Sequence, residues 1–208
     1  MKQLTLLSKA AMCVAFLALG LSLPAHAQLT GYTAELDTML WETEVGDPLE
    51  AYAYYGSYSV YANFTNASDI LSAVFASNVD TLLTPPMGID ASCGCLNPAS
   101  TSIAVDGSNN PLLFGSFPEY QFDSFWTIGM ESSEEDGQLP NTIGMGEATS
   151  LCDGVAITDG AMFIYGSGET TPPNAIAGDD LKVLIARVTT CGDFTPVSYT
   201  HLTLPTKA

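Results

Sequence analysis

Alternation of apolar and polar residues is the main structural signal along this chain, with the period of two that β-strands show. The clearest case runs from Ser57 to Phe64, where every second residue is apolar or aromatic, which predicts a half-buried strand. Residues 181–188 are apolar on both faces at their centre, so they are expected to form a central strand with neighbours on both edges. Further strands are predicted at 29–40, 70–75, 102–105, 120–128 and 161–165.

Stretches rich in Gly, Pro, Asn and Asp separate these segments, and helical periodicity is nearly absent. Short strands with this punctuation are typical of all-β proteins. The sequence therefore predicts an all-β fold, specifically an antiparallel β-sandwich of the jelly-roll or Ig-like kind. The alternation does not specify the order of the strands within the sheets.

The N-terminal segment has the features of an export signal. Lys2 and Lys9 give a basic start, Ala10–Leu23 is almost wholly apolar, and a small-x-small motif ends at Ala27. The apolar run is short for a membrane-spanning helix. Residues 1–27 are therefore predicted to be a cleaved signal peptide, and the mature protein is expected to be secreted, extracellular or at the cell surface.

The C-terminal segment 196–208 looks unlike the rest of the chain. Its PVSYTHLTLPT run resembles a translated sequencing adapter and no protein domain, so this tail is interpreted as non-native. The length between the two ends favours one domain, at residues 28–195. That domain is expected to be incomplete at its C-terminus.

The predicted domain is strongly acidic. All 23 Asp and Glu residues lie within 28–195, where two basic residues, Lys182 and Arg187, leave a net charge of −21. Affinity for nucleic acid requires cationic side chains that neutralise phosphates, and an anionic membrane would repel this surface. We therefore expect neither partner. The acidity fits a saline setting, divalent cations or solubility alone.

Histidine is absent from residues 28–195, because His26 and His201 both lie outside them. This excludes a Ser-His-Asp or Cys-His catalytic site and a histidine-bearing metal site in the domain. Paired carboxylates can hydrolyse glycosides without histidine, but no pattern selects two of the acidic residues. Trp41 and Trp126 are also few tryptophans for an enzyme that stacks sugars. We expect no catalytic residues and no enzyme activity.

Two acidic clusters are the candidate metal ligands. Grouped carboxylates in loops suit calcium, which takes several oxygen ligands, although no EF-hand spacing is present. The alternative is a solvated acidic surface. The candidate ligands are Glu134, Glu135, Asp136, Asp179 and Asp180.

Aromatic residues are dense near the second predicted strand. If exposed, they could form a contact face for a glycan or a protein. Cross-strand packing is the more common role of such residues, and we favour it. The residues are Tyr52, Tyr54, Tyr55, Tyr58 and Tyr61.

Three stretches carry a resemblance to a known type of domain: SYSVYANFTNASDILSAVFA (57–76), EYQFDSFWTIGM (119–130) and AGDDLKVLIARVTTCGDF (177–194). They resemble a domain found in large, multi-domain secreted proteins of marine bacteria. The resemblance implies an extracellular, β-sandwich module whose chain continues past Phe194. It assigns no functional residues.

Taken together, the sequence predicts a non-catalytic extracellular module of a larger cell-surface or secreted protein, with a structural or adhesive role. Its expected partners are other domains of that protein and a surface glycan or protein. A calcium-dependent carbohydrate-binding module is the first alternative. A small secreted glycoside hydrolase with paired carboxylates is the second. No cofactor is expected beyond calcium as the candidate ion.

The cysteines generate a testable prediction. Residues 28–195 hold four cysteines, Cys93, Cys95, Cys152 and Cys191. The compartments that receive exported proteins are oxidising, so such thiols are expected to form disulfides. A bond between Cys93 and Cys95 would close a very tight ring, so each is expected to reach Cys152 or Cys191. A four-thiolate metal site and a redox-active pair are less favoured, because no C-x-x-C motif is present.

We expect at least one disulfide from Cys93 or Cys95 to Cys152, and its removal should cost about 2–5 kcal/mol of stability. Mass spectrometry of unreduced peptides checks this, and finding every thiol free contradicts it.

Overall fold

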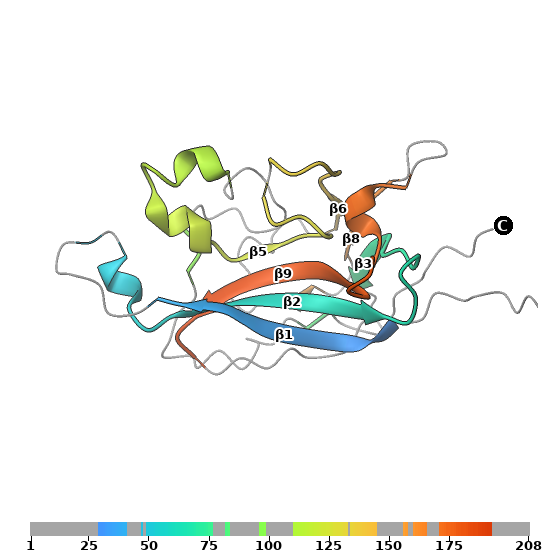
Figure 1. The fold of residues 1–208 in the computed structure, drawn as a ribbon, viewed down its shortest axis with the longest axis horizontal. Coiled ribbons are helices and arrows are strands. Elements are labelled where there is room, and N and C mark those ends of the chain that lie inside the picture. Colours follow the sequence, from blue (N-terminus) through green and yellow to red (C-terminus); the bar gives the residue numbers. More distant parts are fainter. Residues whose placement is uncertain are drawn as a thin grey trace, which may run out of the picture.

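The computed structural model describes residues 29–40, 47, 49–76, 82–83, 96–98, 110–132, 134–144, 156–157, 160–165 and 171–192. Their regular structure consists of antiparallel strands and short 3-10 helices, with no α-helix (Figure 1). The predicted all-β fold is confirmed. In this part of the chain, no helix has the length and apolar character needed to cross a membrane.

The described residues form nine strands and four 3-10 helices. The strands are β1 Leu29–Met39, β2 Gly56–Phe64, β3 Ala73–Ala76, β4 Leu82–Leu83, β5 Phe125–Trp126, β6 Asn141–Ile143, β7 Ala156–Ile157, β8 Gly160–Phe163 and β9 Lys182–Thr190. The 3-10 helices are η1 Glu50–Tyr52, η2 Pro111–Leu113, η3 Pro118–Phe122 and η5 Pro173–Ala175.

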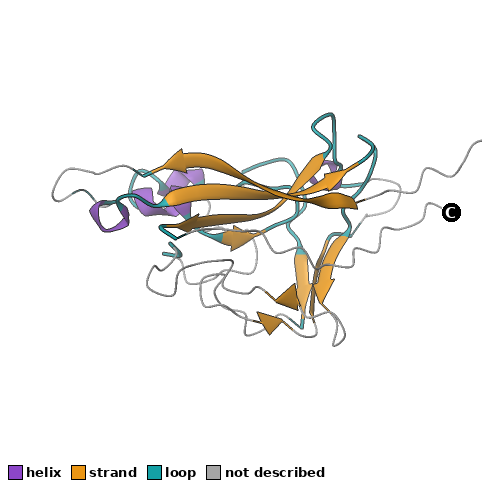
Figure 2. Ribbon diagram, turned by 90° about the horizontal axis from the view of Figure 1, so that it is seen from below, coloured by secondary structure: helices purple, strands orange, loops and turns teal. Residues whose placement is uncertain are grey.

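The strands form three antiparallel sheets, as Figures 1 and 2 show. The four-stranded sheet has the order β1-β2-β9-β5, the three-stranded sheet β3-β8-β6, and the smallest sheet pairs β4 with β7. Strand β9 thus lies between β2 and β5, which confirms the prediction of a central strand for the segment 181–188.

A β-bulge in β9 sets which residues face the core. Val60 pairs with Ala186 and Tyr61 with Leu184, so Ile185 is an extra residue on β9. Ile185 and Ala186 therefore both lie in the core, although they are adjacent in sequence. Strict alternation from Ile185 would turn Arg187 into the core as well, whereas the bulge places its side chain on the opposite face.

One hydrophobic core joins the four-stranded and three-stranded sheets. Strands β2, β5 and β9 contribute side chains from one sheet, and β3 and β8 contribute them from the other. The two sheets do not close on each other, so the jelly-roll or Ig-like sandwich stays a prediction. The core contains Val60, Ala62, Phe64, Leu71, Val74, Trp126, Ile128, Met162, Ile164, Ala175, Ala177, Val183, Ile185, Ala186 and Val188.

The strand predicted at 120–128 is wrong in its first half. Residues 118–122 form η3, and only Phe125–Trp126 is a strand. Pro118 is the first residue of η3, where its fixed φ suits a helical turn, and the Gln121 side chain donates to the Pro118 carbonyl at 2.9 Å. The segment predicted at 102–105 lies outside the described residues.

The environment of Tyr32 on β1 generates a prediction about alkaline stability. Its ring packs against the core, its buried hydroxyl has no hydrogen-bond partner among the described residues, and burial raises its pKa to about 12. Since the folded state favours the neutral ring, this contribution to stability is complete below pH 10 and is lost as the pH rises from about 10 through 12.

Tyr32→Phe removes this ionisation and the unpaired hydroxyl. The variant should be as stable as the wild type or more so at pH 7, and it should lose less stability between pH 10 and 12. Thermal melting at each pH checks this, with Tyr165→Phe at an exposed ring as the control. Equal alkaline losses in wild type and Tyr32→Phe contradict the prediction.

Candidate functional site

A pocket of about 350 Å³ lies on the face of the four-stranded sheet that is turned away from the shared core. Its floor is formed by Tyr61 on β2 and by Lys182 and Leu184 on β9. The register opposes Tyr61 to Leu184, and opposed residues point to the same face of a sheet. The full lining is Tyr61, Gly129, Glu131, Glu135, Pro173, Asn174, Ile176, Asp180, Lys182, Val183 and Leu184.

Two loops form the walls of this pocket. One follows β5 and carries Glu131 and Glu135, and the other is the segment from η5 to β9, which carries Asn174 and Asp180. The Glu131 amide donates to the Glu135 carboxylate at 3.1 Å, so the first loop folds back on itself. The site therefore assembles three parts of the chain that are far apart in sequence.

Lys182 on β9 is held at the pocket by an ion pair with Glu35 on β1, the strand on the far side of β2. Its ammonium lies 2.7 and 2.8 Å from the two Glu35 carboxylate oxygens and 4.0 Å from the centroid of the Tyr61 ring. The hydrogen bond to Glu35 raises the pKa of Lys182, and burial raises the pKa of Tyr61. Lys182 is therefore a fixed cation in an otherwise acidic pocket.

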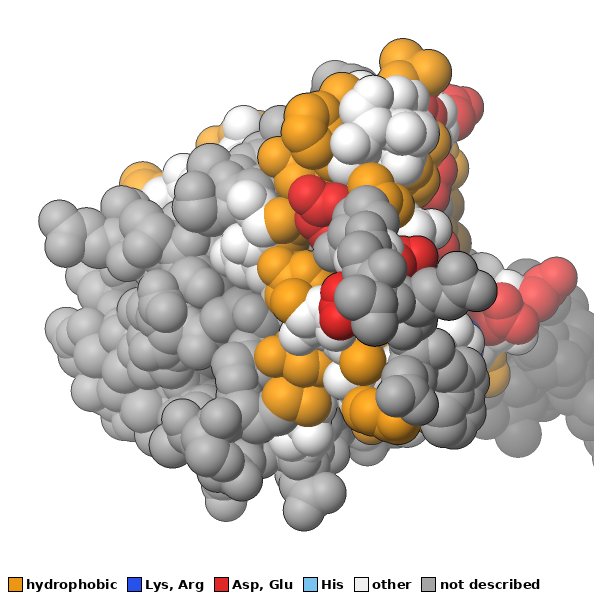
Figure 3. Space-filling model, turned by 90° about the vertical axis from the view of Figure 1, so that its left-hand side faces the viewer, with side chains coloured by type: hydrophobic (Ala, Val, Ile, Leu, Met, Phe, Trp, Pro, Cys, Tyr) orange, Lys and Arg blue, Asp and Glu red, His pale blue; other side chains and the backbone are white. Residues whose placement is uncertain are grey.

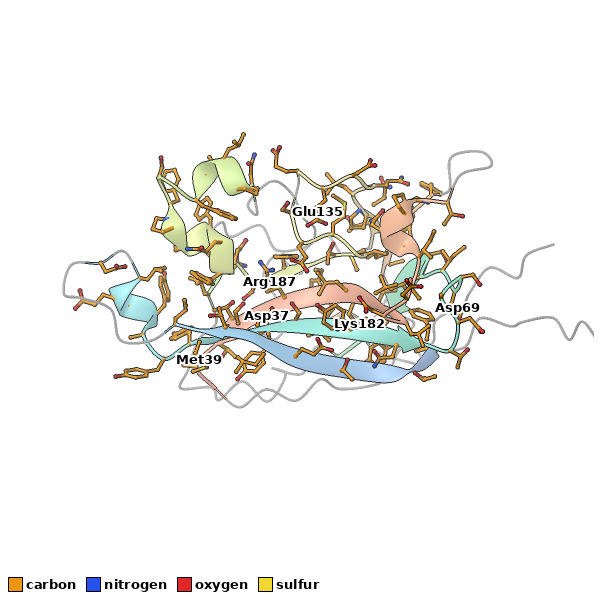
Figure 4. All side chains as sticks on the ribbon, in the orientation of Figure 1. Asp37, Met39, Asp69, Glu135, Lys182 and Arg187 are labelled. Carbon is orange, nitrogen blue, oxygen red and sulfur yellow. The ribbon has the colours of Figure 1, made fainter. Side chains whose placement is uncertain are left out.

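The second cation of the described chain, Arg187, lies deeper under the same loop. One guanidinium nitrogen is 3.7 Å from the Glu131 carboxylate, a second donates to the Gln121 carbonyl at 3.3 Å, and the guanidinium carbon lies 5.3 Å from the centroid of the Phe125 ring. Figure 4 shows Glu135, Arg187, Lys182 and Asp37 spread across the sheet from the loop toward β1.

Asn174 fixes in place the loop that carries Glu131 and Glu135, which we call the acidic loop. Its side-chain nitrogen donates to the carbonyls of Ile128 at 2.6 Å and Gln138 at 3.1 Å, and its oxygen accepts the Gln138 amide at 3.1 Å. Gly129 has φ +68, and a Cβ there would lie 1.7 Å from the Asn174 carbonyl oxygen. The close approach of the two loops thus requires glycine at 129.

The structure divides the five predicted metal ligands. Glu135 and Asp180 line the same pocket, whereas Glu134, Asp136 and Asp179 do not. Over the residues that the structure describes, no group of three or more His, Cys, Asp or Glu side chains could hold a metal ion. Calcium therefore stays a prediction.

Sequence reasoning missed Glu131, Lys182 and Glu35 as parts of the site. Lys182 carries a signal that could have found it, since it is one of two basic residues in the acidic domain. The predicted tyrosines are divided as well. Tyr61 lines the pocket, Tyr52 and Tyr55 pack edge to face at 5.6 Å, and Tyr54 is 55% exposed.

Cys191 directly follows β9, while Cys93, Cys95 and Cys152 lie outside the described residues. The Leu96 amide donates to the Thr189 carbonyl at 2.8 Å, and the Leu96 carbonyl accepts the Ser124 amide at 3.0 Å. Leu96, the residue after Cys95, thus lies beside Thr189, which is two residues before Cys191. The disulfide pairings of the four cysteines stay predictions.

Comparison with protein-family models, with curated proteins and with solved structures finds no match to this chain. The fold and the pocket therefore define its class: an all-β protein with a mixed-charge, mostly acidic pocket on one sheet face.

The role of Asn174 generates a prediction about the acidic loop. Asn174→Ala removes three hydrogen bonds and leaves polar backbone groups unpaired, so it should cost about 1–3 kcal/mol and loosen residues 128–138. Hydrogen exchange should show faster exchange at the Gln138 amide. Gly129→Ala should disturb the same loop through its clash, and unchanged exchange in both variants contradicts the role.

Proposed function

We propose that this protein is a non-catalytic extracellular module of a larger cell-surface or secreted protein, and that it acts in adhesion by binding a surface glycan in the pocket between the acidic loop and β9. The observation that carries the proposal is the pocket itself. It brings the carboxylates of Glu131, Glu135 and Asp180 into one lining with Lys182, whose ammonium lies 4.0 Å from the centroid of the Tyr61 ring.

This set of groups suits a polyhydroxylated ligand. Carboxylates accept hydrogen bonds from sugar hydroxyls, and an ammonium donates to ring and hydroxyl oxygens. Hydrogen bonds to charged groups are stronger than neutral ones, which compensates for a shallow and mostly polar site. The ion pair between Lys182 and Glu35 holds the donor in position before the ligand arrives, which lowers the entropic cost of binding.

Binding is favoured over hydrolysis by the environment of the carboxylates. A glycosidase needs a general acid whose pKa is raised by burial or by a neighbouring anion. The Glu131 side chain is 57% exposed and its carboxylate lies 3.7 Å from the Arg187 guanidinium, so it is not a buried carboxyl group of this kind.

A calcium-dependent version of this function is the second candidate. Two of the five predicted metal ligands, Glu135 and Asp180, line the same pocket. Calcium takes six to eight oxygens, and ligand hydroxyls or water can complete such a shell around two carboxylates.

A glycan array probed with the protein, with calcium and with a chelator, tests both candidates. Retention of signal with the chelator supports the first, and its loss supports the second. Glu135→Gln and Asp180→Asn should each weaken binding about tenfold, because they remove charged acceptors from the pocket.

The same two loops supply matched controls. Glu134→Gln and Asp179→Asn make the same chemical changes one residue away, at side chains that do not line the pocket, and should leave binding unchanged. Absence of binding to every glycan, or equal losses in the pocket variants and the controls, contradicts the proposal.

A further inference from the structure

A second surface lies at the end of the molecule formed by the neighbouring 3-10 helices η2 and η3. Leu112 is 79% exposed and Phe117 is 45% exposed. The Phe117 ring stacks on Tyr120, with centroids 5.2 Å apart and planes 21° apart. We call these three residues the apolar tip. Clustered apolar side chains on a surface mark interaction sites more often than isolated ones do.

The local backbone holds the apolar tip in a defined shape. Asn110 caps η2 by accepting the Leu112 amide at 2.9 Å, and Pro111 begins its turn. The carbonyl of Leu113 then accepts the amide of Phe117 at 2.8 Å, and η3 begins at the next residue. Side chains that are ordered in advance bind a partner at a lower entropic cost.

Tyr54 adds an aromatic ring at the same end of the molecule, next to η1 (Figures 1 and 2). It has φ +69, a conformation that is strained for a bulky residue, and the residue is 55% exposed. Strained residues are concentrated at functional positions. Figure 3 looks onto this end and shows apolar side chains over much of its described part, with carboxylates between them.

The charges around this surface identify the kind of partner. Glu50 and Glu119 lie in the first turns of η1 and η3, and Figure 3 shows no basic side chain on the described part of this face. Within the described chain, the basic side chains Lys182 and Arg187 are both in salt bridges on β9. A second copy of this acidic chain is therefore a poor complement.

We propose that the apolar tip, with Tyr54 and its acidic surroundings, is a docking surface for a cationic peptide segment that also carries apolar side chains. Lysine or arginine side chains of the partner pair with Glu50 and Glu119 and approach the aromatic faces, while its apolar side chains cover Leu112 and Phe117. This surface is separate from the pocket, whose lining shares no residue with it.

Fluorescence anisotropy with three labelled heptapeptides tests this proposal. A peptide of alternating lysine and leucine should bind, and its affinity should fall as salt is added. Peptides of alternating lysine and serine, or glutamate and leucine, should bind at least about tenfold more weakly. Equal binding of the lysine–serine peptide overturns the apolar part of the proposal, and equal binding of the glutamate–leucine peptide overturns its charge part.

Variants locate the binding on the molecule. Leu112→Ser with Phe117→Ser should weaken binding of the lysine–leucine peptide about tenfold. Ile143→Ser with Tyr165→Ser, at side chains that are 66% and 62% exposed elsewhere, should not change it. All four changes are at the surface, so circular dichroism should show an unchanged fold. Equal affinity of the two double variants overturns the proposal.

Discussion

The bulge at Ile185 is the constraint on which the rest of this structure depends. It allows two neighbouring residues of β9 to enter the core, and it returns Arg187 to the opposite face of the sheet. Without it, the guanidinium would point into the hydrophobic core, where an unpaired charge is very costly. The bulge thus gives the central strand one wholly apolar side and one side that carries the cations.

The pocket is a consequence of that division. With both cations on the outer face of the four-stranded sheet, carboxylates from three chain segments gather over them. Glu131 comes from the loop after β5, Glu35 from β1 and Asp180 from the approach to β9. Asn174 then locks one loop onto another with hydrogen bonds that involve backbone groups. The cations organise this face, and the carboxylates determine what it offers to a ligand.

The sequence predicts those parts of the molecule where local pattern and tertiary structure agree. Strands β2 and β9 follow from alternation and apolar runs, because each has a face or a centre that is buried. Strand β1 also lies where the alternation predicts it, although its residues are at most partly buried. The strand prediction is wrong at residues 120–122 because Pro118 begins a helical turn that runs into the alternating segment. Carboxylate density singles out Glu135 and Asp180, which line the pocket. The pairing of Lys182 with Glu35 spans 147 positions and depends on strand order, which no local pattern encodes.

The internal pairing of the two cations also determines how the molecule behaves as a colloid. Lys182 and Arg187 are both bound to carboxylates of their own chain, so the described surface presents a nearly pure polyanion to its surroundings. Such a particle carries an atmosphere of counterions about 30 Å deep at 0.01 M ionic strength and about 3 Å deep at 1 M. Neighbouring copies on one surface would therefore stand apart in dilute medium and crowd together in brine. Their lateral spacing would be controlled by salinity, with no contact between them.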